Sequence, residues 1–139
     1  MTPETVQQLR ADLKRDEGLR LKPYLDTVGK VSIGFGRNLD DRGISEDEAE
    51  FLLAEDVKLV LNDIRHLFPW VLNETQNRQR AFANLLFNLG ATKLGKFKNT
   101  LAHWAAGQHQ KAADGIRASL YAKQVGARAE RIAKLVEQG

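Results

Sequence analysis

The sequence of 139 residues contains no cysteine, only three prolines and one methionine, and no long apolar run. Without cysteine the chain can form no disulfide, offers no thiolate nucleophile and cannot hold a metal through sulfur. No hydrophobic stretch approaches the roughly 20 residues that a transmembrane helix needs. These absences exclude a disulfide scaffold, a thiol enzyme and an integral membrane protein.

Histidine is scarce as well, with His66, His103 and His109 the only three. His103 and His109 lie six residues apart, so they do not form the i, i+4 pair that typically ligates zinc from one helix face. We therefore expect neither a metal site nor a cofactor. Residues 1–18 are rich in charge and lack the apolar core of a secretory signal, which predicts that no signal peptide exports the chain.

Charge is divided unevenly along the chain. Residues 1–88 carry 12 Lys or Arg against 15 Asp or Glu, whereas residues 89–139 carry 9 against 3, a charge of +6. This asymmetry predicts a polyanionic partner, either nucleic acid or an acidic envelope polymer, with a solvated basic helical surface as the alternative. The run Lys93, Lys96 and Lys98 has only Phe97 interleaved and matches no DNA-reading motif, so we expect no nucleic-acid partner.

Caps and hydrophobic spacing predict a mostly helical α+β fold. Thr2-Pro3-Glu4 is typical of a helix start, and Gly18 is typical of its end. The alternation from Val31 to Phe35, preceded by the turn sequence Asp26-Thr27-Val28-Gly29, predicts a β-hairpin over about residues 19–37.

A capping box at Ser45-Glu46-Asp47-Glu48 begins a long helix over about residues 45–68, which Pro69 ends. A helical lobe follows over about residues 70–139. Its first helix is capped by Asn73 or Thr75 and ends at Gly90, and shorter helices follow around residues 101–106, 110–122 and 127–137. We expect a single domain, residues 1–139, whose two lobes share a cleft along the long helix.

Candidate chemistry gathers early in the chain: Glu17 at a helix end, Asp26 in a turn and Ser32 in the returning strand. Glycoside cleavage uses two carboxyl groups in different environments, one donating a proton and one ionised. Spacing alone does not separate this interpretation from a structural one, in which Glu17 is a solvated last-turn acid and Asp26 a turn former. Gly34 and Gly36 likewise either punctuate a strand or allow a ligand to approach closely.

Three segments together resemble the bacteriophage-type lysozymes, the muramidase family that includes the enzyme of the T-even phages. The catalytic segment of that family is similar to Asp16-Glu17-Gly18-Leu19-Arg20-Leu21-Lys22-Pro23-Tyr24 with Asp26-Thr27-Val28-Gly29 and Ser32-Ile33-Gly34-Phe35-Gly36. Gly43 to Glu50 resembles the start of the family's long helix, and Arg80 to Gly90 resembles the helix that lines its cleft. Tyr121, Gln124, Arg128 and Arg131 resemble its closing motif.

The resemblance implies a lysozyme-like fold and an endolysin. Such an enzyme hydrolyses the β-1,4 bond between N-acetylmuramic acid and N-acetylglucosamine in peptidoglycan and lyses the host cell. By resemblance Glu17 protonates the leaving oxygen, Asp26 activates a water and Ser32 helps to hold that water, with inversion at the anomeric carbon. The expected partner is the peptidoglycan glycan strand, bound by a monomer that is made in the bacterial cytoplasm and reaches the cell wall after release.

Supporting residues follow from the same resemblance. Arg128 is expected to bring a positive charge near Glu17, and Asn84 and Asn88, four residues apart on one helix face, are expected to bind sugar amides or hydroxyls. A surface arginine and ordinary helix-end asparagines are the alternatives that the residues alone leave open. The aromatic residues Trp70, Phe87, Trp104 and Tyr121 are expected in the core rather than as sugar platforms.

Three departures from the family pattern stand out. Serine occupies position 32, where threonine is common, so the hydroxyl lacks the methyl that restricts its rotamer. Arg37 stands where histidine is common, and we expect it to pair with Asp40, Asp41 or another acid. The segment of residues 38–43 is short. A peptidoglycan-binding module with weak or no catalysis is the alternative function, against which the retention of Glu17, Asp26 and Ser32 argues.

Overall fold

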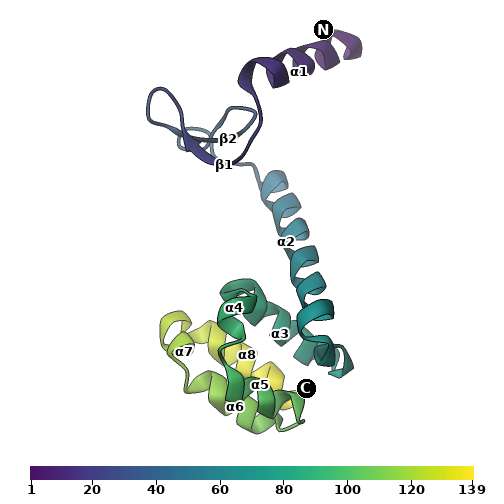
Figure 1. Cartoon of the computed structure of the whole chain (residues 1–139), viewed down its shortest axis with the longest axis vertical. Coiled ribbons are helices and arrows are strands. Elements are labelled where there is room, and N and C mark those ends of the chain that lie inside the picture. Colours follow the sequence, from purple (N-terminus) through teal and green to yellow (C-terminus); the bar gives the residue numbers. More distant parts are fainter. The chain divides into compact units, whose positions relative to one another are not determined.

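Eight α-helices, one 3-10 helix and three short strands make up the chain, and the computed structural model describes every residue from 1 to 139 (Figure 1). The chain divides into two units, residues 1–51 and 52–139. The elements in chain order are α1 (Pro3–Glu17), β1 (Arg20–Leu25), β2 (Val31–Gly34), β3 (Arg37–Asn38), α2 (Glu46–Leu67), η1 (Pro69–Asn73), α3 (Gln76–Leu89), α4 (Ala91–Leu94), α5 (Lys98–Ala105), α6 (His109–Arg117), α7 (Leu120–Val125) and α8 (Ala127–Gln138). The fold is mostly helical α+β, as the sequence predicts.

The starts of α1, α2 and α3 follow the side-chain caps expected from the sequence. The hydroxyl oxygen of Thr2 accepts a hydrogen bond from the backbone N–H of Thr5, and Pro3 occupies the first helical position of α1. At α2 the hydroxyl of Ser45 accepts from the Glu48 N–H at 3.1 Å while the Glu48 carboxylate accepts from the Ser45 N–H at 2.9 Å, which completes a capping box. Of the two candidate caps of α3, Thr75 is the one used.

The strands of the N-terminal unit form one antiparallel sheet in the order β1-β2-β3. Tyr24 faces Ser32 and Arg20 faces Gly34, so four positions of β1 correspond to two of β2 and the ladder is irregular between them. Pro23 falls in this irregular part of an edge strand, where its missing N–H costs no ladder hydrogen bond. The predicted hairpin is confirmed, and the third strand, β3, is an addition that the sequence pattern did not indicate.

The C-terminal unit holds the hydrophobic core. Helix α8 (yellow in Figure 1) contacts α3, α6 and α7, and α6 also contacts α5. At its centre the Phe82 and Trp104 rings meet edge to face at 5.4 Å, and Trp70 approaches Phe82 at 5.4 Å in the same manner. Trp104 and Tyr121 are buried as expected. Phe87 is not: it is 44% exposed, so its assignment to the core is wrong.

The helix predicted over residues 110–122 is in fact two helices, α6 and α7. The chain leaves α6 after Arg117, and the hydroxyl oxygen of Ser119 then accepts from the Ala122 N–H to cap α7. Ser119 also donates to the Ile116 carbonyl at 2.6 Å, which satisfies a carbonyl at the end of α6. A serine within a helical hydrophobic pattern is compatible with one continuous helix or with a break. Here Ser119 caps a new helix, so the pattern is divided into two helices.

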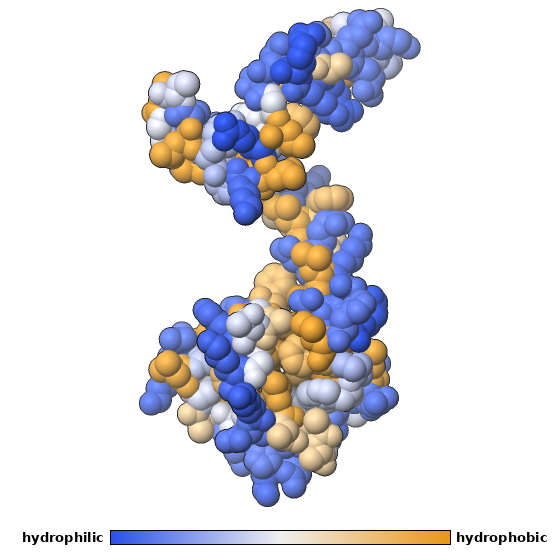
Figure 2. All heavy atoms as spheres, in the orientation of Figure 1, coloured by the Kyte–Doolittle hydropathy of each residue, from blue (hydrophilic) through white to orange (hydrophobic).

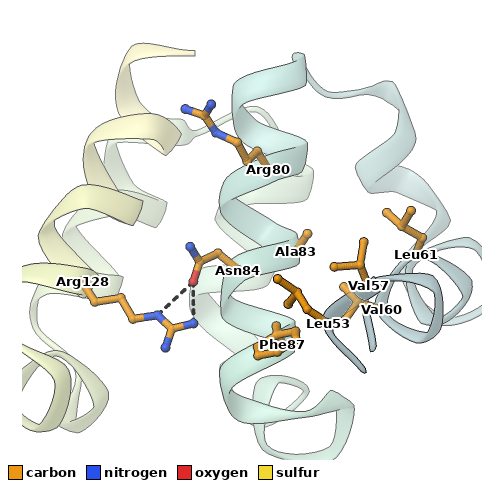
Figure 3. Close-up of a pocket in the computed structure, with 9 residues that line it drawn as sticks. All are labelled: Leu53, Val57, Val60, Leu61, Arg80, Ala83, Asn84, Phe87 and Arg128. Carbon is orange, nitrogen blue, oxygen red and sulfur yellow. Dashed lines mark hydrogen bonds between the residues drawn. The ribbon is translucent and has the colours of Figure 1, made fainter. Parts of the chain in front are cut away.

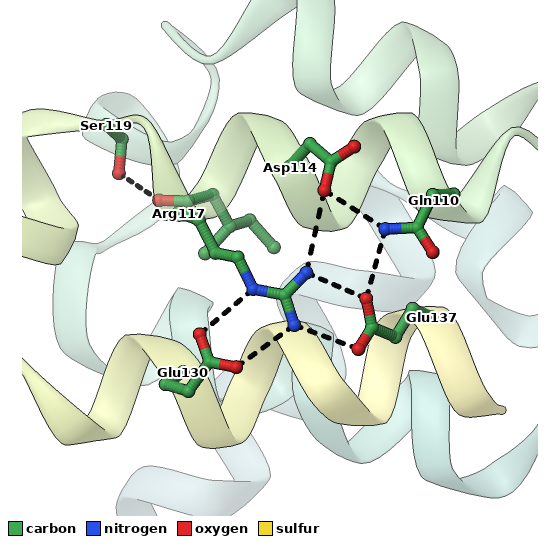
Figure 4. Close-up of polar contacts among 7 residues, drawn as sticks. Gln110, Asp114, Arg117, Ser119, Glu130 and Glu137 are labelled. Carbon is green, nitrogen blue, oxygen red and sulfur yellow. Dashed lines mark hydrogen bonds and ion pairs between the residues drawn. The ribbon is translucent and has the colours of Figure 1, made fainter.

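One ion-pair network joins α6 to α8 (Figure 4). The Arg117 guanidinium donates to Glu130 at 2.9 and 3.1 Å and to Glu137 at 2.7 and 2.9 Å. This double pairing holds the pKa of the Glu137 carboxyl down at about 2 and lowers that of Glu130. The network lies on the rim of the core, where it fixes the register of the two helices.

Apolar side chains line much of α2. Figure 2 shows hydrophobic residues (orange) on the visible face of this helix, and Phe51, Leu53 and Leu59 are among those exposed.

None of the helices combines the length and the apolarity that crossing a membrane requires.

Candidate functional site

The three residues expected to carry the chemistry all lie in the N-terminal unit. Glu17 is the last residue of α1, Asp26 follows β1 in the hairpin turn, and Ser32 lies in the middle strand, β2. The three candidates thus come from the end of a helix, a turn and a strand, all within 16 consecutive positions, residues 17–32.

Glu17 is positioned by the end of its helix and by a second glycine further along the chain. Gly18, at φ 71°, ends α1 and donates its N–H to the Lys14 carbonyl at 3.1 Å. The Glu17 carboxyl then lies against the α-carbon of Gly36, where an added methyl group would stand only 2.7 Å from Oε2. Gly36 thus allows a close approach by this acid, whereas the sequence suggested a strand break or the approach of a ligand.

Asp26 organises the turn in which it stands. Its backbone N–H donates to the Lys30 carbonyl at 2.8 Å, and its own carbonyl accepts from Gly29 at 3.1 Å. Its side-chain Oδ1 accepts from the N–H groups of Val28 and Lys30, both at 2.9 Å. The carboxylate is therefore fixed by one oxygen, so the structural role that the sequence left open is present. Its second oxygen, Oδ2, takes no part in these two bonds.

Ser32 occupies the centre of the small sheet, opposite Tyr24 on one side and Asn38 on the other. It is 3% exposed and is the one buried residue of the N-terminal unit. Pairing on both edges of β2 fixes the backbone from which the hydroxyl projects.

Arg37 makes a two-pronged ion pair with Glu48, at 2.9 and 2.7 Å, and also donates to the Gly43 carbonyl. The pairing, with help from the Ser45 N–H, lowers the pKa of Glu48 to about 2. The partner is thus neither Asp40 nor Asp41 but the other acid that the sequence left unnamed. Asp40 instead accepts from the Val31 N–H at 2.7 Å, and Asp41 pairs with Lys30.

Two of the predicted substrate-binding residues meet in the C-terminal unit (Figure 3). Arg128 donates from Nε and Nη2 to the same oxygen, Asn84 Oδ1, at 2.9 and 2.8 Å. With its oxygen occupied, the Asn84 amide keeps its two N–H donors for another acceptor. Asn88 is exposed one turn further along α3. Arg128 and Glu17 belong to different units, so the expected proximity of these two residues stays a prediction.

Arg128 and Asn84 border a largely apolar pocket of about 350 Å³ in the C-terminal unit. Its wall includes Phe87, which accounts for the exposure of that ring, together with side chains of α2 (Figure 3). The other lining residues are Leu53, Val57, Val60, Leu61, Arg80 and Ala83. Asn88 is not part of this lining.

Comparison with known proteins gives the class of the chain. The phage lysozyme family model matches residues 14–137, which include all six predicted site residues. This chain belongs to the phage lysozyme family. Lysozymes are hydrolases, so membership places the chain in that class of enzymes.

Individual relatives differ in how much of them the chain covers. A protein of Dictyostelium discoideum named "Probable T4-type lysozyme 2" is 29% identical over 96% of both chains. The endolysin of Salmonella phage P22 is 37% identical over 56% of this chain and 58% of its own length. The pre-baseplate central spike protein Gp5 of Enterobacteria phage T4 is 29% identical over 91% of this chain but 27% of its own.

Proposed function

We propose that this chain is an endolysin that hydrolyses the β-1,4 bond between N-acetylmuramic acid and N-acetylglucosamine in peptidoglycan. The observation that carries the proposal is the arrangement of Glu17, Asp26 and Ser32 around one small hairpin in a chain of the phage lysozyme family. The chain acts as a monomer that accumulates in the host cytoplasm, and it lyses the cell once released to the wall.

Glu17 is the general acid in this proposal. As the bond from the anomeric carbon breaks, Glu17 gives its proton to the departing oxygen, which becomes the hydroxyl of the leaving sugar. The support is its position: the carboxyl lies at the end of α1 and rests on the backbone at Gly36, so contact on one side limits where the exposed acid can lie. Fixing a proton donor in this way reduces the entropy lost in reaching the transition state.

Asp26 is the general base. Oδ1 is held by two N–H groups at 2.9 Å, so the carboxylate has a fixed direction and Oδ2 remains to receive a proton from water. The water adds its oxygen to the anomeric carbon from the side opposite the leaving group, and Ser32 contributes a hydroxyl hydrogen bond to it. The same negative charge stabilises the oxocarbenium-like transition state.

Glycan binding extends to the C-terminal unit in this proposal. Because Arg128 occupies the oxygen of Asn84, the Asn84 amide is left as a donor suited to an acetamido carbonyl or a sugar hydroxyl. Asn88, exposed on the same helix, supplies a further donor and acceptor. Replacing Asn84 by alanine should raise KM more than it lowers kcat, because uniform binding is lost.

A turbidity assay on outer-membrane-permeabilised Gram-negative cells tests the function directly. Glu17→Gln should abolish lysis while the melting temperature is unchanged, because an amide cannot donate the required proton. Asp16→Asn is the matched control: it neutralises the neighbouring exposed acid and should retain activity. Activity of Glu17→Gln within a few fold of wild type would contradict the assignment, and wall binding by a wild type that releases no muropeptide would indicate a binding module.

The stereochemistry of the product tests the role of Asp26. A base that acts through water requires the two carboxyl groups roughly 6.5–9.5 Å apart and gives the α-anomer first. Time-resolved proton NMR of a short chitin or muropeptide substrate detects the first anomer before mutarotation. Initial formation of the β-anomer would mean that Asp26 attacks the sugar itself, and the water-holding role of Ser32 would be wrong.

A further inference from the structure

We propose that Gly36 is a positioning residue for catalysis: its missing side chain is the space in which the Glu17 carboxyl rests. This inference depends on the proposed function of Glu17 as general acid. It concerns a backbone position that contributes no chemical group of its own, so no motif of acids or hydroxyls points to it.

The contact is close and involves a single partner. A methyl group on the Gly36 α-carbon would lie 2.7 Å from Oε2, 3.1 Å from Cδ and 3.5 Å from Cγ of Glu17. All three atoms belong to the Glu17 side chain. The first of these distances is too short for any real carbon to oxygen contact, so a side chain at position 36 must push the carboxyl away.

Gly36 is itself firmly held, so the acid has to move rather than the backbone. Ile33 pairs with Arg37 across the turn between β2 and β3, which encloses Gly36. Immediately after it, Arg37 is fixed by its two-pronged pair with Glu48 and by the Gly43 carbonyl. Glu17 is by contrast exposed at the end of its helix. Displacing it should cost little stability, yet a shift of about 1 Å in a reacting group can slow catalysis about 100-fold.

The chain supplies a matched control at Gly34. Both glycines have a positive φ, 70° at Gly34 and 77° at Gly36, so a β-carbon strains the backbone at both positions. A β-carbon at Gly34, however, meets nothing within 4 Å. The difference between the two alanine variants therefore isolates the contact with Glu17 from the strain of the backbone.

Steady-state kinetics on soluble peptidoglycan fragments test the proposal, with melting temperatures measured for each variant. Gly36→Ala should lower kcat about 100-fold with KM within a few fold, and it should shift the alkaline limb of the pH profile, which reports the general acid. Gly34→Ala should lower the melting temperature to a similar extent but keep kcat within a few fold of wild type. Equal kcat values for the two variants would overturn the proposal.

A double-mutant comparison adds a readout that a purely structural glycine would not move. In a Glu17→Asp background the shorter acid withdraws from Gly36, so the further change Gly36→Ala should lower kcat only a few fold. The same 100-fold loss in both backgrounds would show that Gly36 acts without Glu17. If wild type and Gly34→Ala lyse cells, Glu17→Gln does not and Gly36→Ala does, the positioning role fails while the proposed function stands.

One measurement needs no variant at position 36. In wild type labelled with both 13C and 15N, the Gly36 amide resonance should titrate with the same midpoint as the Glu17 carboxyl carbon, and Glu17→Gln should abolish that titration. The Gly34 amide should not follow it. A Gly36 amide that is insensitive to the ionisation of Glu17 would refute the contact, even if Gly36→Ala does not fold.

Discussion

The two units of the chain are built on opposite principles. Every buried hydrophobic side chain belongs to residues 52–139, whereas the N-terminal unit of 51 residues buries only Ser32. The N-terminal unit instead takes its local order from hydrogen-bonded turns, caps and the Arg37–Glu48 pair. The proposed acid, base and hydroxyl are all in that unit. The buried core and the proposed chemistry therefore lie in different parts of the sequence, and substitutions should affect stability and activity separately.

The largest effect on stability should come from the core of the C-terminal unit. Trp104 is fully buried between Phe82 and Trp70, and Trp104→Ala should cost about 3–5 kcal/mol of unfolding free energy because it leaves a cavity. Urea denaturation followed by circular dichroism measures the loss. Trp104→Phe should cost less, since it keeps a ring and removes an indole N–H that has no hydrogen-bond partner.

The corresponding control in the N-terminal unit is Leu21→Ala. Leu21 is 81% exposed, so its removal should change the unfolding free energy by less than about 0.5 kcal/mol. A loss at Leu21 as large as that at Trp104 would break the comparison, because it would mean that the N-terminal unit holds a core of its own.

Asp26 should separate structure from chemistry within one residue. Asp26→Asn keeps an oxygen that can accept from Val28 and Lys30, so the melting temperature should stay unchanged while activity falls about 100-fold or more with the loss of the base. Asp26→Ala removes the acceptor as well and should also lose about 1 kcal/mol of stability. Turbidity assays and thermal melts on the same preparations check both results. Equal melting temperatures for the two variants would show that the Asp26 side chain has no structural role.

A smaller effect, dependent on pH, is expected at Arg117. Its pairing lowers the pKa of Glu137 from 4.5 to about 2, so the folded state is stabilised above pH 4.5 and this contribution is lost as pH falls toward about 2. Arg117→Met should lower the melting temperature by a few degrees at pH 7, and the difference from wild type should shrink between pH 4.5 and 2. Thermal melts across this range measure it.

Arg37→Met is the N-terminal counterpart of that variant. Glu48 also has its pKa lowered to about 2, but its side chain is 41% exposed against 21% for Glu137, and Ser45 still supports it. Its effect on the melting temperature should be the smaller of the two. A larger effect at Arg37 would show that global stability depends on the N-terminal pair.

The smallest expected effect is on binding to the cell wall, and it comes from the difference in net charge between the two parts of the chain. Residues 89–139 carry +6, and salt shortens the screening length from about 30 Å at 0.01 M to about 8 Å at 0.15 M. Binding to anionic wall polymers should weaken a few fold over that range, as measured by pelleting with cell walls. Replacing Lys93, Lys96 and Lys98 by glutamine should reduce this dependence, while Lys22→Gln in the N-terminal unit should not. Binding that is independent of salt would exclude the electrostatic contribution.

Much of the local structure could be predicted from the sequence. The caps at Thr2, Ser45 and Thr75 and the turn at Asp26 work through hydrogen bonds between residues two to four positions apart. Such bonds depend on residue type and spacing, which a sequence displays directly. The resemblance to phage lysozymes added the three candidate catalytic residues, and the family itself is confirmed by the match over residues 14–137.

Only the tertiary structure decided which distant groups meet. Glu17 rests on Gly36, Arg37 pairs with Glu48 rather than Asp40, and Arg128 reaches Asn84 from 44 positions away. For each of these groups the sequence offers several possible partners. Which partner it contacts depends on how the chain packs, and the spacing of residues in the sequence does not reveal that packing. The exposure of Phe87 has the same cause, because a helix period identifies an apolar face but not whether another element covers it.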